Sequence, residues 1–107
     1  MQKIEIGNQV IVYGTEPMQI PTAAHVRQLT ITIPFLFKEK PTVNATISGD
    51  GPGGGFVIWN IIIAPTGTST IIKFSANNIV IGQPDKANYE CAYTVIGQKN
   101  DKRYILQ

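Results

Sequence analysis

Apolar side chains recur at every second position in several short segments of this chain, and polar side chains fill the positions between them. A period of two places alternate side chains on opposite faces of a β-strand, so each segment can bury one face. No segment long enough for a helix has the helical period, and strands recur about every ten residues, which is typical of an all-β sandwich. The inward-facing residues are predicted to be Leu29, Ile31 and Ile33, then Val43, Ala45 and Ile47, and finally Tyr89, Cys91, Tyr93 and Val95.

The longest apolar stretch is Phe56–Ala76, FVIWNIIIAPTGTSTIIKFSA. Its first half, Phe56–Ile63, is apolar at almost every position, which is typical of a strand covered on both faces or facing another subunit. Its second half, Thr68–Ser75, alternates and follows a Pro-Thr-Gly turn in which Gly67 can take a positive φ. We therefore expect a β-hairpin at the centre of a sheet.

The remaining segments are predicted to be short strands and loops. Two short alternating runs, Lys3–Ile6 and Gln9–Tyr13, predict either a small hairpin or one extended arm. Pro17 and Pro21 predict a connecting loop over 14–24. Further along the chain we expect a corner at Asn77-Asn78, a short strand at 79–81, and a short terminal strand at 103–107.

Composition limits the classes of function that are open to this chain. At 107 residues it is expected to form one domain. Apolar residues make up 43% and charged residues only 15%, against a norm of about 25%, which suggests that part of the surface is covered by a partner. A net charge of +2, with basic residues clustered only at Lys99, Lys102 and Arg103, does not favour nucleic-acid binding. The N-terminal run contains Glu5 and does not resemble a signal peptide, and no run is long enough for membrane insertion, so a soluble, cytoplasmically made protein is expected.

Two features could suggest catalysis, and neither fits. The glycine-rich segment 50–55, DGPGGG, lacks the Lys-Ser/Thr of a phosphate-binding loop and precedes a predicted strand. It is interpreted as a loop between strands, or as a loop at a ligand rim or subunit junction. His25 is the only histidine, and Ser48 and Asp50 are its nearest possible partners without a nucleophile-elbow motif. The sequence predicts no enzyme, no cofactor and no metal site.

Three other features of the sequence have a plain structural interpretation. Cys91, the single cysteine, is predicted to be a small buried hydrophobe, because the neighbouring Glu90 has the wrong charge to activate a thiol. Trp59 is expected in a core or an interface rather than as a platform for a sugar. Asn44-Ala45-Thr46 matches the N-glycosylation sequon but lies in a predicted strand, and is interpreted as a chance match.

Three stretches together resemble the H-type lectin domain, the family of the snail agglutinin and the discoidin C-terminal domain. They are LTITIPFLFKEKPTVNATIS, VIWNIIIAPTGTSTIIKF and NYECAYTVIG, which lie within residues 26–97. The resemblance implies an antiparallel six-stranded β-sandwich that forms a homotrimer, with host-surface carbohydrate bound at the subunit edges. It also implies a place in a bacteriophage tail fibre or another virion appendage, among other virion proteins. The expected organisation is an arm and connecting loop at 1–24, the sandwich at 25–98, and a turn with a short strand at 99–107.

The resemblance does not extend to the sugar-contacting residues. The family's arginine and Trp-His pair fall here on Gly55 and on Ser75-Ala76, which offer neither a guanidinium nor an aromatic ring. The expected function is therefore a non-enzymatic trimeric virion or surface-attachment module, with a purely structural virion protein that binds no sugar as the alternative. The candidate ligand-binding residues are Asp50, Gly54, Gly55, Asn77 and Asn78, and the candidate trimer-interface residues are Phe56, Ile58, Trp59, Ile61 and Ile63.

Overall fold

The computed structural model describes residues 1–19, 26–49, 56–78 and 89–100, and for Phe56, Val57, Trp59, Asn77 and Asn78 it describes the backbone alone. These residues form seven strands and no helix: β1 (Gln2–Ile6), β2 (Gln9–Pro17), β3 (Val26–Ile33), β4 (Thr42–Gly49), β5 (Phe56–Pro65), β6 (Thr70–Asn78) and β7 (Tyr89–Gln98). All the pairings between them are antiparallel. The all-β prediction is confirmed for the described residues, and the expected count of six strands is corrected to seven.

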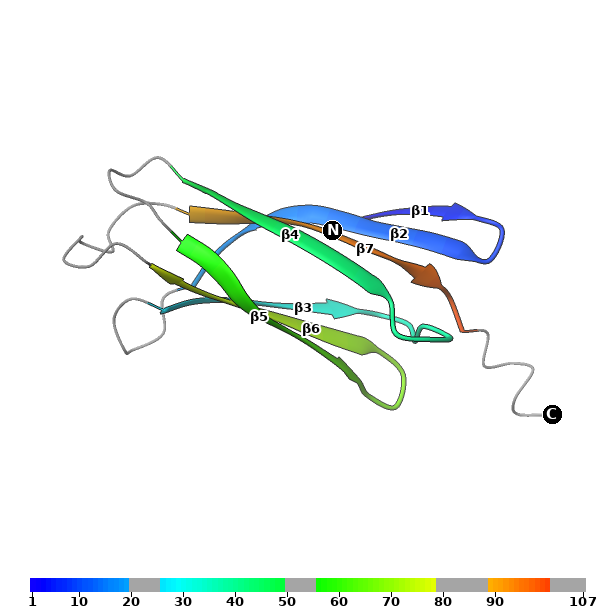
Figure 1. The fold of residues 1–107 in the computed structure, drawn as a ribbon. Coiled ribbons are helices and arrows are strands. Elements are labelled where there is room, and N and C mark those ends of the chain that lie inside the picture. Colours follow the sequence, from blue (N-terminus) through cyan, green and yellow to red (C-terminus); the bar gives the residue numbers. More distant parts are fainter. Residues whose placement is uncertain (20–25, 50–55, 79–88, 101–107) are drawn as a thin grey trace.

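The strands form two sheets that face each other in a sandwich (Figure 1). One sheet has four strands in the order β1-β2-β7-β4, and the other has three in the order β3-β6-β5. The molecule is long and thin, with extents of 57 × 24 × 16 Å. Each sheet therefore has one outer face and two long edges.

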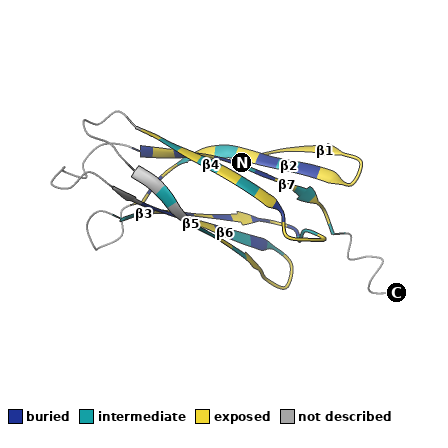
Figure 2. Ribbon diagram, in the orientation of Figure 1, coloured by how far each residue is buried: buried dark blue, intermediate teal, exposed yellow. Residues whose placement is uncertain are grey.

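The core lies between the sheets and is built from residues of β2 to β7, whereas β1 is exposed along its whole length (Figure 2). The predicted inward faces of β3 and β7 are confirmed, because Leu29, Ile31, Ile33, Tyr89, Cys91, Tyr93 and Val95 are all buried. On β4, Val43, Ala45 and Ile47 are half-buried against this core, and the residues between them are exposed. Single-strand periodicity therefore identifies the core-facing side of these strands correctly.

The N-terminal segment is part of the sandwich. Of the two predicted forms, the hairpin is the one found: β1 and β2 are joined at Gly7, whose φ of 60° suits a tight turn. The expected loop from Gly14 is wrong as far as Pro17, because β2 continues to that residue and pairs with β7 along its whole length. Val10 and Val12 of β2 are 1% exposed, so this segment supplies core residues.

The predicted central hairpin is found, but its position in the sheet differs from the expectation. β6 occupies the centre of its sheet, whereas β5 is an edge strand that pairs only with β6 among the described residues. An apolar run of this length can be a fully covered central strand or an uncovered edge strand, and the pairing partners decide between them. The expectation that β5 lies at the centre is therefore corrected.

The turn of this hairpin is held by side chains and not by a left-handed glycine. Among the described glycines only Gly7 has a positive φ, so Gly67 does not take the conformation that was allowed for it. Instead the Thr66 hydroxyl oxygen accepts a hydrogen bond from the Ser69 amide at 3.0 Å, and the Thr66 amide donates to the Ser69 carbonyl at 2.7 Å. A hydroxyl that bonds nearby backbone in this way fixes a turn without special backbone geometry.

Candidate functional site

The outer face of the four-stranded sheet carries uncharged polar residues in register across three strands. Tyr13 of β2 pairs with Thr94 of β7, which pairs on its other side with Asn44 of β4. Two residues further along the strands, Ala92 of β7 pairs with Thr15 of β2 and with Thr46 of β4. These side chains point outward because the residues between them face the core.

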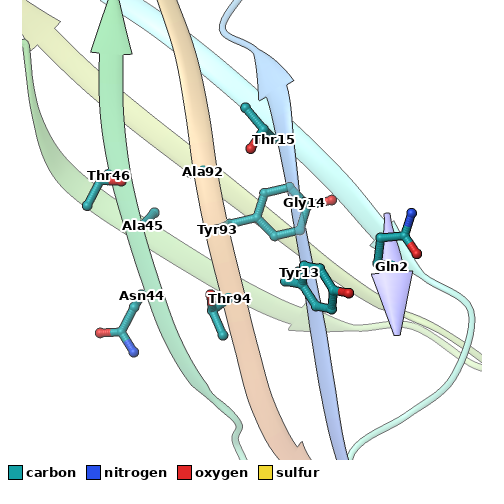
Figure 3. Close-up of a pocket in the computed structure, with 10 residues that line it drawn as sticks. All are labelled: Gln2, Tyr13, Gly14, Thr15, Asn44, Ala45, Thr46, Ala92, Tyr93 and Thr94. Carbon is teal, nitrogen blue, oxygen red and sulfur yellow. The ribbon is translucent and has the colours of Figure 1, made fainter. Parts of the chain in front are cut away.

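A hollow of about 430 Å³ is present on this face (Figure 3). It lies over the centre of the sheet because Ala92 is a small residue flanked by the longer Thr15 and Thr46 on the neighbouring strands. The volume falls within the range of small-molecule sites, roughly 300–1,000 Å³. The lining residues come from four strands and are Gln2, Tyr13, Gly14, Thr15, Asn44, Ala45, Thr46, Ala92, Tyr93 and Thr94.

The polar side chains that line the hollow have no hydrogen-bond partner in the part of the chain that the structure describes. No side-chain hydrogen bond is found within the described residues for the six exposed or half-exposed polar residues of the lining, which are Gln2, Tyr13, Thr15, Asn44, Thr46 and Thr94. Amides and hydroxyls can both donate and accept, so these side chains can bind a ligand that does the same. None of the lining residues is charged.

The floor beneath the hollow is closely packed. Gly14 and Tyr93 are paired in the register, and a Cβ added to Gly14 would lie 2.7 Å from the Tyr93 hydroxyl oxygen. The Tyr93 ring is stacked near Phe74, with centroids 6.0 Å apart. Its hydroxyl is buried and has no hydrogen-bond partner among the described residues. Burial, and then the nearby Glu16 carboxylate and Cys91, raise the pKa of Tyr93, so this hydroxyl is held in its neutral form.

The ligand-binding residues predicted from sequence lie elsewhere. Asp50, Gly54 and Gly55 fall outside the described residues. Asn77 and Asn78 form the last two positions of β6 rather than a corner after it, and Asn78 pairs with Phe56 at the start of β5. This pairing brings the end of β6 beside the residue that follows Gly55, at the end of the sandwich where β5 begins and β6 finishes (Figure 1).

Ser75 and Ala76, which the lectin resemblance would align with sugar-contacting residues, lie in the interior. Ser75 is 9% exposed and Ala76 is fully buried. Neither residue therefore offers a surface to a ligand.

The predicted trimer-interface residues lie on the edge strand β5. Ile58, Ile61 and Ile63 are half-buried and pack against the core of the same chain. Phe56 and Trp59 are placed by their backbone only, and the pairing of β5 with β6 shifts register between Ile58 and Asn60. The isoleucines are thus only partly covered by their own chain.

The described residues contain neither a cluster of metal-ligating side chains nor an exposed thiol. In the described ranges no three His, Cys, Asp or Glu side chains come close enough to hold a metal ion. Cys91 is buried, and burial raises the pKa of its thiol to about 11, so the reactive thiolate is disfavoured. Across the part of the chain that the structure describes, no helix is long and apolar enough to cross a membrane.

Comparisons with protein families, with curated proteins and with solved structures find no match to this chain.

Sequence reasoning missed the hollow because its residues are far apart in the chain. Tyr13, Asn44 and Thr94 are neighbours only because β7 lies between β2 and β4, an order that no local pattern encodes. The available signal was the alternation of uncharged polar residues on each strand, which marked the outward faces without showing that they adjoin.

Proposed function

We propose that this chain is a non-catalytic β-sandwich module that works by assembling with copies of itself, as a trimer, in a surface-attachment structure such as a virion appendage. The observation that carries the proposal is the lack of charged residues in the two edge strands on one side of the sandwich. The two edge strands on that side, β4 and β5, contain no Lys, Arg, Asp or Glu over Thr42–Gly49 and Phe56–Pro65. The contact between β4 and β5 supports the placement of both edges on the same side.

An unprotected edge strand favours association. The outer edge of a sheet exposes unpaired backbone N–H and C=O groups, and soluble monomers usually protect such edges with charges. β1, the edge strand on the other side of its sheet, carries Lys3 and Glu5, whose charged groups lie 3.7 Å apart. β5 has no such protection and also exposes 46% of the Ile62 side chain.

A copy of the same chain fits this side better than a charged partner does. The two strands themselves offer no charge to a partner, and Lys38, Glu39 and Lys40 border β5 only at its end, beside Ile63 and Pro65. The half-exposed isoleucines, Ile58, Ile61 and Ile63, resemble the apolar centre of a homomeric interface. Association of copies buries these side chains and covers the free edge of β5. The number of three copies and the attachment role follow from the resemblance to H-type lectins, and the alternative remains a structural virion protein that uses the same contacts without binding sugar.

Two matched variants test the proposal. Ile62 and Thr30 lie on opposite sides of Lys73 in the same sheet, Ile62 on β5 and Thr30 on β3. A glutamate at either position faces the Lys73 ammonium group, so the charge within one folded copy is similarly balanced. Ile62→Glu introduces a carboxylate on the proposed interface, and Thr30→Glu introduces it on the opposite edge strand.

Sedimentation equilibrium at micromolar concentration gives the readout. We expect a trimer mass for the wild type and for Thr30→Glu, and a shift towards monomer for Ile62→Glu, with unchanged far-UV circular dichroism. A wild-type monomer, or equal dissociation of the two variants, would contradict the proposal.

A further inference from the structure

We propose that the hollow on the outer face of β2, β7 and β4 binds a neutral, hydroxyl-rich ligand, that is, an uncharged saccharide. This inference rests on the proposed attachment function and places its recognition site on a sheet face, with lining residues that differ from the candidates predicted from sequence. The six amide and hydroxyl side chains that border the hollow, without a hydrogen-bond partner among the described residues, carry the inference.

The chemistry of the lining selects the class of ligand. An anionic or cationic ligand would find no counter-charge, because every lining residue is uncharged. A purely apolar ligand would remove water from the Asn44 amide and the Thr46 and Thr94 hydroxyls without replacing their hydrogen bonds, which is costly. A saccharide has hydroxyl groups that both donate and accept, so it can satisfy amides and hydroxyls together.

An aromatic ring completes the site. Tyr13 is 38% exposed and borders the hollow beside Gln2, while Asn44 and Thr46 border it from β4 (Figure 3). The C–H groups on one face of a sugar ring can pack on the Tyr13 ring, while the sugar hydroxyls reach the amides and threonines. The hollow therefore combines an apolar surface with several polar groups that can fix the orientation of a ligand.

The site is held by paired strands and not by loops. β7 is hydrogen-bonded on both sides, to β2 and to β4, so the spacing between Tyr13, Thr94 and Asn44 is fixed by the sheet. Sites built on strands hold their side chains more precisely than sites built on loops. Little ordering is then needed when the ligand binds, which favours affinity.

Substitutions at exposed positions can fill the hollow or remove one of its polar groups without a change in the core. Ala92 is exposed, so Ala92→Gln places a neutral side chain in the hollow at little cost to folding. Asn44→Ala removes one amide from an exposed position of β4. Thr32→Gln is the matched control, because Thr32 is equally an exposed strand residue but lies on β3 in the other sheet.

The experiment uses the full chain in two steps. The first step is an array of immobilised neutral oligosaccharides ending in galactose, N-acetylgalactosamine, glucose or mannose, with sialylated and sulfated counterparts. The second step is a solution titration with the best neutral sugar, followed by the NMR shifts of the Thr46 and Thr94 methyl groups. We expect binding to neutral sugars in preference to the charged counterparts, and a loss of affinity of about tenfold or more for Ala92→Gln and for Asn44→Ala, with Thr32→Gln unchanged.

The outcomes separate this inference from the proposed function. No binding by a chain that sediments as a trimer, or binding that is lost in Asn77→Ala or Asn78→Ala and kept in Ala92→Gln, would overturn the saccharide site and leave self-association standing. Binding that is lost as expected, in a chain that sediments as a monomer, would support the hollow and overturn the trimer. Preference for the sialylated or sulfated counterparts would overturn the neutral class of ligand.

Discussion

Replacement of Tyr93 by phenylalanine is expected to stabilise the fold. The Tyr93 side chain is almost wholly enclosed, and its hydroxyl has no hydrogen-bond partner among the described residues. A buried polar group without a partner costs about 1–3 kcal/mol. Tyr93→Phe removes that group and keeps the ring beside Phe74. The free energy of unfolding should therefore rise by about 1–2 kcal/mol, because the small void left by the oxygen offsets part of the gain.

Gly14 allows the same contact to be tested from the opposite strand. A Cβ at position 14 would lie 2.7 Å from the Tyr93 hydroxyl oxygen and 3.0 Å from Cζ. Gly14→Ala should then destabilise the wild type by about 1–3 kcal/mol, the usual range for overpacking. In the Tyr93→Phe background the closest atom is removed and the penalty should become smaller, so the two changes should be non-additive.

Urea unfolding followed by far-UV circular dichroism measures these differences, at one fixed protein concentration because association shifts apparent stability. Tyr13→Phe is the control, since it removes an exposed hydroxyl from a tyrosine on the neighbouring strand and should change stability by less than about 0.5 kcal/mol. A loss of about 1 kcal/mol or more in Tyr93→Phe would refute the reasoning, because it would show that the buried hydroxyl is satisfied in solution.

Three further predictions concern backbone, pH and a buried cation. Gly7→Ala should lower the free energy of unfolding by about 1 kcal/mol in the same urea assay, because the φ of 60° at this position is unfavourable for alanine. At Gly67 φ is not positive and nothing lies within 4 Å of the new Cβ, so Gly67→Ala should leave the free energy of unfolding unchanged or raise it by about 0.5 kcal/mol. Burial raises the pKa of Cys91 from 9.0 to about 11, so the folded state binds this proton more tightly than the unfolded state does. The contribution of Cys91 to the free energy of unfolding should be complete below pH 9 and fall by about 2–3 kcal/mol as the pH rises through 11. In thermal melts at about pH 8 to 11.5, Cys91→Ala should reduce this fall. Arg27→Lys should cost about 1–2 kcal/mol by thermal melting, since the Arg27 guanidinium lies 4.6 Å from the centroid of the Tyr89 ring and lysine lacks its planar group; an equal melting temperature would show that the stacking is unimportant.

The parts of the fold that sequence predicted are those fixed by local periodicity. Leu29, Ile31 and Ile33 alternate with polar residues, and a period of two in a strand allows only one choice of buried face. The same argument placed Cys91 and Tyr93 in the core. Turn geometry was less predictable, because the sequence left 3–13 open between a hairpin and an extended arm, and the positive φ lies at Gly7 and not at Gly67.

The predictions that were wrong or missing concern features that depend on which strands become neighbours in the sheets. β5 was expected to be central because it is apolar throughout. In the order β3-β6-β5, however, β6 has a neighbour on each side and β5 lies at the edge. The extension of β2 to Pro17 was hidden by Gly14, which weakens a strand prediction but here leaves room for the Tyr93 ring. The hollow depends on the order β2-β7-β4, which joins residues from both ends of the chain, so no single segment could have shown it.

Residue-resolved hydrogen exchange on the wild-type protein tests the central claim, that copies of this chain cover the uncharged side formed by β4 and β5. Alternate amides of β5 point away from β6, and alternate amides of β1 point away from β2; neither set has a strand partner among the described residues. We predict that the outward amides of β5 exchange slowly at the concentration where the protein sediments as a trimer and faster on dilution, while those of β1 exchange fast at both. Equal and rapid exchange at the two edges, independent of concentration, would contradict the account.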